Sequence, residues 1–218
     1  MENNKNYIDD IAEIRKIMEK SSRFISLSGL SGISAGIVAL VGAAFTYFYF
    51  NFDDTYFNTN LYFIKGLYLR LAHSINFLII EGVIILVLAV SLAILFTVLR
   101  ARKNNLQVWD KTTKRLLINL AIPLLTGGLF CLALIYHQIY YLIAQVTLVF
   151  YGLALLNASK YTLNEIRYLG IIQIILGLLS SFLIGYGLVF WAIGFGLVHI
   201  IYGAVMYYRY ERNYIKIK

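Results

Sequence analysis

The chain has 218 residues, of which 60% are hydrophobic and only 14% are charged, and its formal net charge is +8. Soluble domains carry about a quarter charged residues, and a soluble protein of this length could not cover so much apolar surface. The composition therefore excludes an ordinary globular enzyme, a disordered chain and a collagen-like repeat. The single cysteine, Cys131, excludes a disulfide framework. Long helix-compatible apolar runs argue against a β-barrel, whose strands would alternate polar and apolar residues.

Charge-free apolar runs predict an all-α, polytopic membrane protein. A helix needs roughly 20 apolar residues to cross a hydrocarbon layer about 30 Å thick, and the backbone must be helical there because lipid offers no hydrogen bonds. The run from 116 to 159 is long enough for two spans and divides at His137 and Gln138, while the run from 168 to 208 divides around Gly185. The sequence therefore predicts a transmembrane domain over 24–208 with six helices, at about 24–48, 75–99, 116–136, 139–158, 167–184 and 188–208.

The basic residues predict how this domain is oriented. Of the 19 lysines and arginines, only Lys65 and Arg70 fall on the side of the membrane opposite the chain ends. Lysine and arginine are retained on the cytoplasmic side, so both termini are predicted to be cytoplasmic. The positive charge then needs no nucleic-acid partner. The expected partners are the lipid bilayer itself and its anionic head groups.

The segments outside the predicted spans are short. Residues 1–23 form a cytoplasmic segment in which Ile8, Ile11, Ile14 and Ile17 recur at helical spacing, which predicts an amphipathic N-terminal helix. That helix either lies on the membrane or a partner, or packs on its own cytoplasmic loop. Residues 209–218 are predicted to be a basic cytoplasmic tail. The aromatic-rich segment 45–68 is expected to follow the outer membrane interface and to enter the second span as a helix from about residue 61.

Small residues mark the faces by which helices are expected to pack, because membrane helices associate through close backbone contact. Such residues recur at helical spacing on the first, fifth and sixth predicted helices, and we expect these three helices to approach closely. The alternative is that these stripes line a substrate path. The stripe residues are Gly29, Gly32 and Gly36, then Gly170 and Gly177, and finally Ala192, Gly196 and Gly203.

The third predicted helix contains Pro123, followed by Gly127 and Gly128. Proline removes a backbone hydrogen bond and kinks helices, so this span is expected to be locally open. Broken helices build ion sites in some transporters, but the second half of the chain has no matching break.

Polar side chains at membrane depth are the candidate functional residues. Glu81 is the only acid within a predicted span, and His199 lies near the middle of the sixth helix. The two could relay protons, or each could form a hydrogen bond that holds the bundle together. Further intramembrane candidates are Asn119, Gln145, Gln173 and Tyr202. No motif for catalysis, nucleotide binding or metal binding is present, so no catalytic residue, metal site or cofactor is predicted.

Four segments resemble an uncharacterised family of bacterial six-helix inner-membrane proteins. They are residues 24–32 (FISLSGLSG), 122–128 (IPLLTGG), 159–161 (SKY) and 187–203 (GLVFWAIGFGLVHIIYG). The resemblance extends over nearly the whole chain. It implies a multi-pass protein of the bacterial cytoplasmic membrane with both termini inside, and it carries over no activity and no functional residue.

The leading hypothesis for function is a non-enzymatic protein that associates with itself or with another membrane protein, because small-residue faces are abundant and no catalytic constellation is present. The first alternative is a small transporter or channel with a proton- or ion-coupled site around Glu81 and His199. The second is a membrane-embedded enzyme or a haem protein, in which His73 and His137 would be the axial ligands.

Overall fold

The computed structural model describes residues 28–52, 63–104 and 108–211. The predicted amphipathic segment 1–23, residues 53–62 of the aromatic-rich segment, and the tail beyond Glu211 lie outside the described residues. Within the described ranges every regular element is a helix, and six of the helices are long and apolar enough to cross a membrane. The prediction of an all-helical chain with six membrane-length helices is thereby confirmed.

Five spans are single helices and the sixth is a composite. The sixth span, here called the C-terminal helix, is continuous from Gly187 to Glu211 but changes to π-helical winding twice. Single 3₁₀ turns, η2 (Tyr140–Leu142) and η3 (Ser159–Tyr161), flank the fourth span. The helices are α2 (Gly29–Phe52), α3 (Phe63–Lys103), α4 (Lys111–Tyr136), α5 (Ile143–Ala158) and α6 (Glu165–Phe182), followed by the parts of the C-terminal helix, α7 (Gly187–Trp191), η4 (Ala192–Val198), α8 (His199–Met206) and η5 (Tyr207–Glu211).

Several helices extend beyond their predicted ranges, among them α3 and the C-terminal helix. α3 begins at Phe63, well before the predicted start at 75, so the helix expected to lead into the second span is continuous with it. The C-terminal helix runs to Glu211, into the stretch expected to be a tail.

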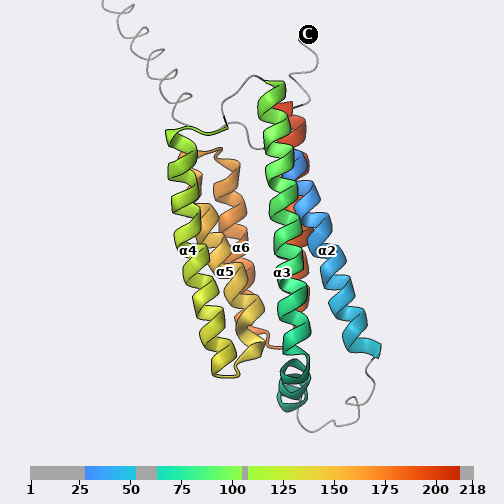
Figure 1. Ribbon diagram of the computed structural model, residues 1–218. Helices are drawn as coiled ribbons and strands as arrows, with labels where there is room; N and C mark the ends of the chain where they lie inside the picture. The colour runs from blue at the N-terminus through green and yellow to red at the C-terminus, as the bar shows by residue number, and fades with distance from the viewer. Residues whose placement is uncertain (1–27, 53–62, 105–107, 212–218) are drawn as a thin grey trace, which may run out of the picture.

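The helices form two groups of three (Figure 1). In one group α2 lies between α3 and the C-terminal helix, and in the other α5 lies between α4 and α6. The groups meet mainly where the C-terminal helix packs against α5 and α6. The last span therefore returns to the first, and it also contacts the α4–α6 group.

The turns fall where polar residues and glycine interrupt the apolar runs. α4 ends at Tyr136, and Gln138 then adopts a left-handed backbone conformation with φ 60°. Between α6 and the C-terminal helix, Gly185 takes φ 100°, which glycine adopts without a steric penalty. These two reversals produce the tight hairpins predicted at these positions.

α4 starts at a side-chain cap. The carboxylate of Asp110 accepts hydrogen bonds from the backbone N–H of Thr113 at 2.6 Å and from its hydroxyl at 2.7 Å. These bonds favour the charged form and hold the pKa of Asp110 below its ordinary value. A capped N-terminus explains why α4 begins at Lys111 rather than at 116, where the apolar run begins.

Pro123 does not open α4, contrary to our expectation. The helix is unbroken from Lys111 to Tyr136. Proline cannot donate to the carbonyl of Asn119, four residues earlier, and Asn157 of α5 supplies the missing donor, with its Nδ2 3.0 Å from that oxygen. The irregular span is the C-terminal helix instead, with its π segment at Ala192–Val198.

Most described cations lie at one end of the bundle, which we call the basic end. Here α3 ends, α4 begins and α5 joins α6 (Figure 1). Lys65 and Arg70, in the first turns of α3, are at the opposite end. The described cations at the basic end are Arg100, Arg102, Lys103, Lys111, Lys114, Arg115, Lys160, Arg167 and Arg209.

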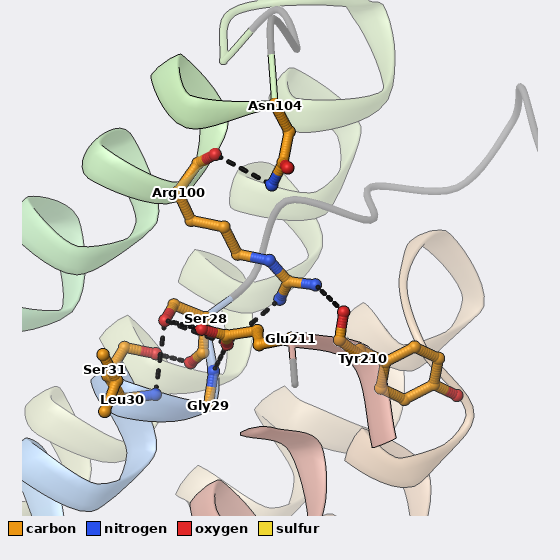
Figure 2. A network of polar contacts seen from close by, with 8 residues as sticks. All are labelled: Ser28, Gly29, Leu30, Ser31, Arg100, Asn104, Tyr210 and Glu211. Atoms are coloured by element: carbon orange, nitrogen blue, oxygen red, sulfur yellow. Dashed lines mark hydrogen bonds and ion pairs between the residues drawn. The ribbon is translucent and has the colours of Figure 1, made fainter. Parts of the chain in front are cut away.

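Three helix ends are joined at the basic end by one carboxylate (Figure 2). Glu211 Oε1 accepts hydrogen bonds from the backbone N–H of Gly29 at 2.6 Å and from the Ser28 hydroxyl at 3.1 Å. Arg100, in the last turn of α3, lies 3.5 Å from the same oxygen and also donates to the Tyr210 carbonyl. The anion thus faces the positive end of α2, and the cation lies at the negative end of α3.

Candidate functional site

The most concentrated polar group inside the bundle surrounds His199, halfway along the C-terminal helix. The Tyr151 hydroxyl of α5 lies 2.8 Å from His199 Nε2, and His199 Nδ1 lies 2.9 Å from the Gly194 carbonyl. Gln173 of α6 donates to the same carbonyl at 2.8 Å. Gln173 is fully buried and His199 is 5% exposed. Side chains from three helices therefore meet around one imidazole.

These distances fix one tautomer of His199. The Gly194 carbonyl can only accept, so Nδ1 carries the ring proton and donates it. Nε2 is then the acceptor for the Tyr151 hydroxyl. Gln173 Nε2 lies 3.3 Å from Nδ1, but both atoms are donors in this arrangement, so both bonds converge on the Gly194 carbonyl.

The π segment and its glycines make room for this cluster. π bulges recur at functional sites because they redirect side chains and carbonyls. A Cβ atom on Gly194 would lie 2.5 Å from Gln173 Oε1 and 2.5 Å from Leu148, so the amide fits only against a glycine. Phe195 stacks near His199 and Tyr151, with ring centroids 5.9 Å and 5.0 Å away.

Unpartnered oxygens continue this polar line along the contact of α5, α6 and the C-terminal helix, which we call the polar seam. Among the described residues, six buried side-chain oxygens lack a hydrogen-bond partner, and five of them lie on elements of the seam. An unpartnered buried polar group costs about 1–3 kcal/mol, so such a concentration needs a physical reason. The five oxygens are Gln145 Oε1, Glu165 Oε2, Gln173 Oε1, Ser180 Oγ and the Tyr202 hydroxyl.

The two ends of the polar seam differ in charge. At the basic end, Glu165 Oε1 accepts from Arg209 at 2.8 Å and from the Tyr210 hydroxyl at 2.7 Å. At the opposite end the contact is neutral, since the Gln145 amide donates to the Ser180 carbonyl at 3.3 Å. The seam therefore joins an ionic cluster at one end to an amide contact at the other.

Glu81 is not part of the polar seam. Its Oε2 accepts a hydrogen bond of 2.6 Å from Thr46 of α2, and its other oxygen is the sixth unpartnered atom. His199 takes its partners from α5, α6 and its own helix. The structure thus gives the two residues different partners on different helices and does not form the Glu81–His199 relay considered from sequence.

Asn119 has a local role in the structure. Its amide donates to the Arg115 carbonyl one turn earlier, and its own carbonyl receives the Asn157 bond described above. Sequence reasoning missed Asn157 as a partner. The signal was present, because a proline inside a helix leaves a carbonyl that needs a donor from elsewhere.

The small-residue stripes pack in two separate places. Gly29, Gly32 and Gly36 of α2 lie against the backbone of the C-terminal helix, where Gly203 and Gly196 allow close approach. A Cβ on Gly203 would be 2.5 Å from the Ile33 nitrogen. Ala192 lies in the π segment and is half-buried.

The small residues Gly170 and Gly177 of the fifth span, α6, pack mainly on the fourth span, α5, rather than on the first span, α2. A Cβ on Gly170 would lie 2.8 Å from the Gly152 carbonyl, and one on Gly177 would lie 3.0 Å from the Gln145 carbonyl. Our expectation that the first, fifth and sixth helices share one close contact is wrong in this respect. Gly152, which we did not select, is the counterpart of Gly170.

The glycines after Pro123 point in different directions. A Cβ on Gly127 would meet Phe150 of α5 at 2.5 Å, whereas one on Gly128 would meet nothing within 4 Å. The two residues are adjacent in the chain, so one faces the bundle and the other faces outward.

Two residues of the candidate site carried no sequence signal. Tyr151 is one of 18 tyrosines, and nothing in its neighbours distinguishes it. Glu165 lies outside the charge-free runs, and from sequence it looks like an acidic residue in a loop. Only the packing of α6 places it beside Tyr210. Within the described ranges, no three His, Cys, Asp or Glu side chains cluster as a metal site would require.

Comparisons with protein-family models, with curated protein sequences and with solved structures find no match to this chain. The resemblance to a bacterial family of six-helix proteins therefore stays a prediction.

Proposed function

We propose that this chain is a multi-pass protein of a bacterial cytoplasmic membrane, with the basic end of the bundle and both termini on the cytoplasmic side. Two facts support the proposal: six helices have the length and composition of spans, and nine of the eleven described cations lie at the basic end. Lysine and arginine near span ends are retained in the cytoplasm. The resemblance of four segments to a bacterial inner-membrane family supports the compartment.

Cysteine labelling of intact cells tests this orientation. In a Cys131→Ser background, Asn104→Cys lies at the basic end and His137→Cys at the opposite end. An impermeant maleimide should label His137→Cys in intact cells, and Asn104→Cys only after lysis. The reverse pattern would overturn the orientation.

Within that membrane, we propose that the protein acts by association, with a second copy of the chain packing on α3. The observation that carries this proposal is the position of α3. None of the 18 residues in its most hydrophobic stretch is buried, and it packs mainly on α2. Eleven large apolar side chains between Ile79 and Leu99 are exposed.

The α2-facing side of α3 supports the proposal further. Phe77 stacks on Tyr49 at 4.0 Å, Glu81 bonds Thr46, and Ile85 fits against Gly42. Contact with lipid is energetically unfavourable for the half-buried carboxyl group of Glu81, because ionisable residues in spans usually face protein or water. Beside it, Gly82 leaves open space, which allows a second helix to approach closely.

Disulfide crosslinking in native membranes tests this association. In the Cys131→Ser background, Gly82→Cys should form a disulfide-linked dimer on mild oxidation. Gly128→Cys is the matched control, because a Cβ at either glycine meets nothing within 4 Å. Equal crosslinking at both positions, or none at Gly82→Cys, would argue against a dimer along α3.

The alternatives from sequence have less support. A transporter site shared by Glu81 and His199 requires the two side chains to act together, and they bond to different helices. A haem site requires His73 and His137 at one depth on facing helices. His137 is an exposed residue in the turn after α4, and the side chain of His73 lies outside the described residues.

A further inference from the structure

We propose that the half of the polar seam between Glu165 and His199 binds internal water and gives the His199 ring access to protons from the basic end alone. The proposal goes beyond association along α3 and is independent of it.

Glu165 forms the entrance. Its side chain is 14% exposed and one oxygen is bonded to Arg209 and Tyr210, while the other is buried without a partner. The Arg209 side chain is 66% exposed, so bulk water reaches this cluster. A partly exposed carboxylate with one ion-paired oxygen and one buried, unpartnered oxygen is suited to holding a water molecule.

Tyr202 is the polar residue between Glu165 and His199 on the proposed route. It lies on the C-terminal helix between His199 and Tyr210, and Tyr210 bonds Glu165. The helix rises about 4.5 Å from His199 to Tyr202. Its ring packs against the apolar cluster of Leu155, Ile166 and Leu169, and its hydroxyl is buried without a hydrogen-bond partner. A hydroxyl both donates and accepts, so one water on each side would complete its bonding.

The inner end of the route is the His199 cluster. Gln173 is fully buried, its amide nitrogen is fixed on the Gly194 carbonyl, and its oxygen is unpartnered. The titratable groups near His199 in the described chain are Tyr151 of α5 and Tyr202 of its own helix, with Glu165 and Tyr210 farther toward the basic end. α2 presents the backbone of Gly32 and Gly36 here, and α6 presents the neutral Gln173.

The route is closed toward the opposite end. Leu148 is fully buried, and a Cβ on Gly194 would touch it at 2.5 Å, so its side chain fills the space beside the π segment. Gln145 lies three residues before Leu148, toward the opposite end, and bonds Ser180. Toward the basic end His199 is followed by the polar groups of Tyr202 and Glu165, beside the apolar cluster of Leu155, Ile166 and Leu169, whereas in the other direction the buried Leu148 lies between His199 and Gln145.

The chemistry proposed is proton exchange. A proton passes from hydronium to an adjacent oxygen, and each water or hydroxyl accepts one proton and releases another. The Tyr151 hydroxyl transfers its proton to Nε2 and takes one from water, and the ring then releases its Nδ1 proton to a water held by the unpartnered Gln173 oxygen. The reverse transfers, from that water to Nδ1 and from Nε2 to the Tyr151 oxygen, restore the original tautomer, so charge and protonation are unchanged after each cycle.

Hydrogen–deuterium exchange of the His199 ring tests the route. His73→Gln and His137→Gln leave His199 as the only histidine, and ¹⁵N-histidine labelling of the protein in proteoliposomes then makes its ring N–H and its backbone N–H visible by solid-state NMR. After transfer to D₂O, the ring proton should exchange much faster than the backbone amide of the same residue. Ring and amide exchange at the same rate would overturn the proposal, because both would then depend on local unfolding.

Two variants locate the route. Tyr202→Phe removes only the hydroxyl, and ring exchange should slow by about tenfold or more. Gln145→Leu is the matched control beyond Leu148 and should leave the exchange rate unchanged. If Gln145→Leu slows ring exchange and Tyr202→Phe leaves the exchange rate unchanged, access from the basic end is overturned. The thermal unfolding midpoint of each variant shows that the bundle is intact.

Discussion

Single glycines set the distance between helices in this bundle, and their neighbours differ greatly. Gly203 faces the backbone of α2, whereas Gly128 faces open space, although both lie in apolar spans. In lipid, helices gain little from hiding apolar surface, so close backbone packing carries much of the association energy. A methyl group is therefore costly at one glycine and tolerated at the other.

Gly203→Ala should separate α2 from the C-terminal helix. The new Cβ would lie 2.5 Å from the Ile33 nitrogen and 2.6 Å from the Gly29 carbonyl, and backbone on both sides cannot yield. We expect a loss of about 2 kcal/mol in the free energy of unfolding, as is typical of overpacked interiors. Unfolding in mixed detergent micelles, followed by tryptophan fluorescence, measures the loss. Gly128→Ala is the control and should be neutral, and a comparable loss there would contradict the packing described.

A side-chain amide replaces the hydrogen bond that Pro123 removes. Asn157→Ala should cost about 1 kcal/mol, because the Asn119 carbonyl then has no donor within the bundle. In a Pro123→Ala background the backbone can donate instead, so the same change should cost less. The double-mutant cycle, measured by micelle unfolding, should give a coupling of about 1 kcal/mol. Strict additivity would show that Asn157 does not compensate for the proline.

At the scale of elements, charged groups at helix ends fix where the spans begin. Glu211 lies at the N-terminus of α2, and Asp110 caps α4. Both place a negative charge at the positive end of a helix dipole. The partly buried carboxylates thus complement the helices at their ends.

The cap of α4 should make stability depend on pH. Hydrogen bonds from Thr113 lower the pKa of Asp110 in the folded chain, so the unfolded chain binds the proton first as pH falls. The cap contributes fully above the ordinary aspartate pKa of about 3.9 and is lost as pH falls through the lower folded value. Asp110→Asn keeps a capping side chain but should remove this pH dependence, while Asp110→Ala should cost about 1 kcal/mol at neutral pH.

Unfolding of the three proteins between neutral and acidic pH measures this effect. The wild-type chain should lose stability relative to Asp110→Asn only in the acidic range. A difference between the two that is constant with pH would contradict the role of the Asp110 charge.

At the scale of the whole molecule, the first described helix pairs with the last. α2 contacts the C-terminal helix along Gly29, Gly32 and Gly36, and Glu211 bonds the start of α2. Consecutive helices α4, α5 and α6 pack as neighbours in order, but α3 and α4 belong to different groups (Figure 1). The loop between α3 and α4 therefore joins the two groups without being needed for the contact of the first span with the last.

A chain divided in that loop should reassemble. Fragments 1–106 and 107–218, expressed together, should copurify in mild detergent, because α2 and the C-terminal helix meet through close backbone contact. Gly203→Ala in the second fragment should weaken copurification, and Gly128→Ala should not. Failure of the two unaltered fragments to copurify, with both inserted in the membrane, would contradict this pairing.

The candidate site was only partly predictable. His199, Gln173, Gln145 and Tyr202 were selected because polar groups are rare at membrane depth, and the structure places all four in the polar seam. Their partners could not be selected, because Tyr151 and Gly194 differ in no way from other tyrosines and glycines of the spans. Glu81 met the same criterion but bonds α2, since residue type says nothing about which neighbour a helix has.

The sequence alone determined that the described part of the chain is helical, that it has six helices long and apolar enough to cross a membrane, and where two hairpin turns fall. Charge and backbone polarity decide these features locally, because neither is tolerated in hydrocarbon without compensation. Only the tertiary structure decided which helices touch, that the last span contacts the first, and that the irregular span is the C-terminal helix rather than α4. The exposed faces of these helices carry many large apolar side chains, so apolar character does not mark the contacting faces, and helix pairing depends on backbone contact between residues far apart in the chain.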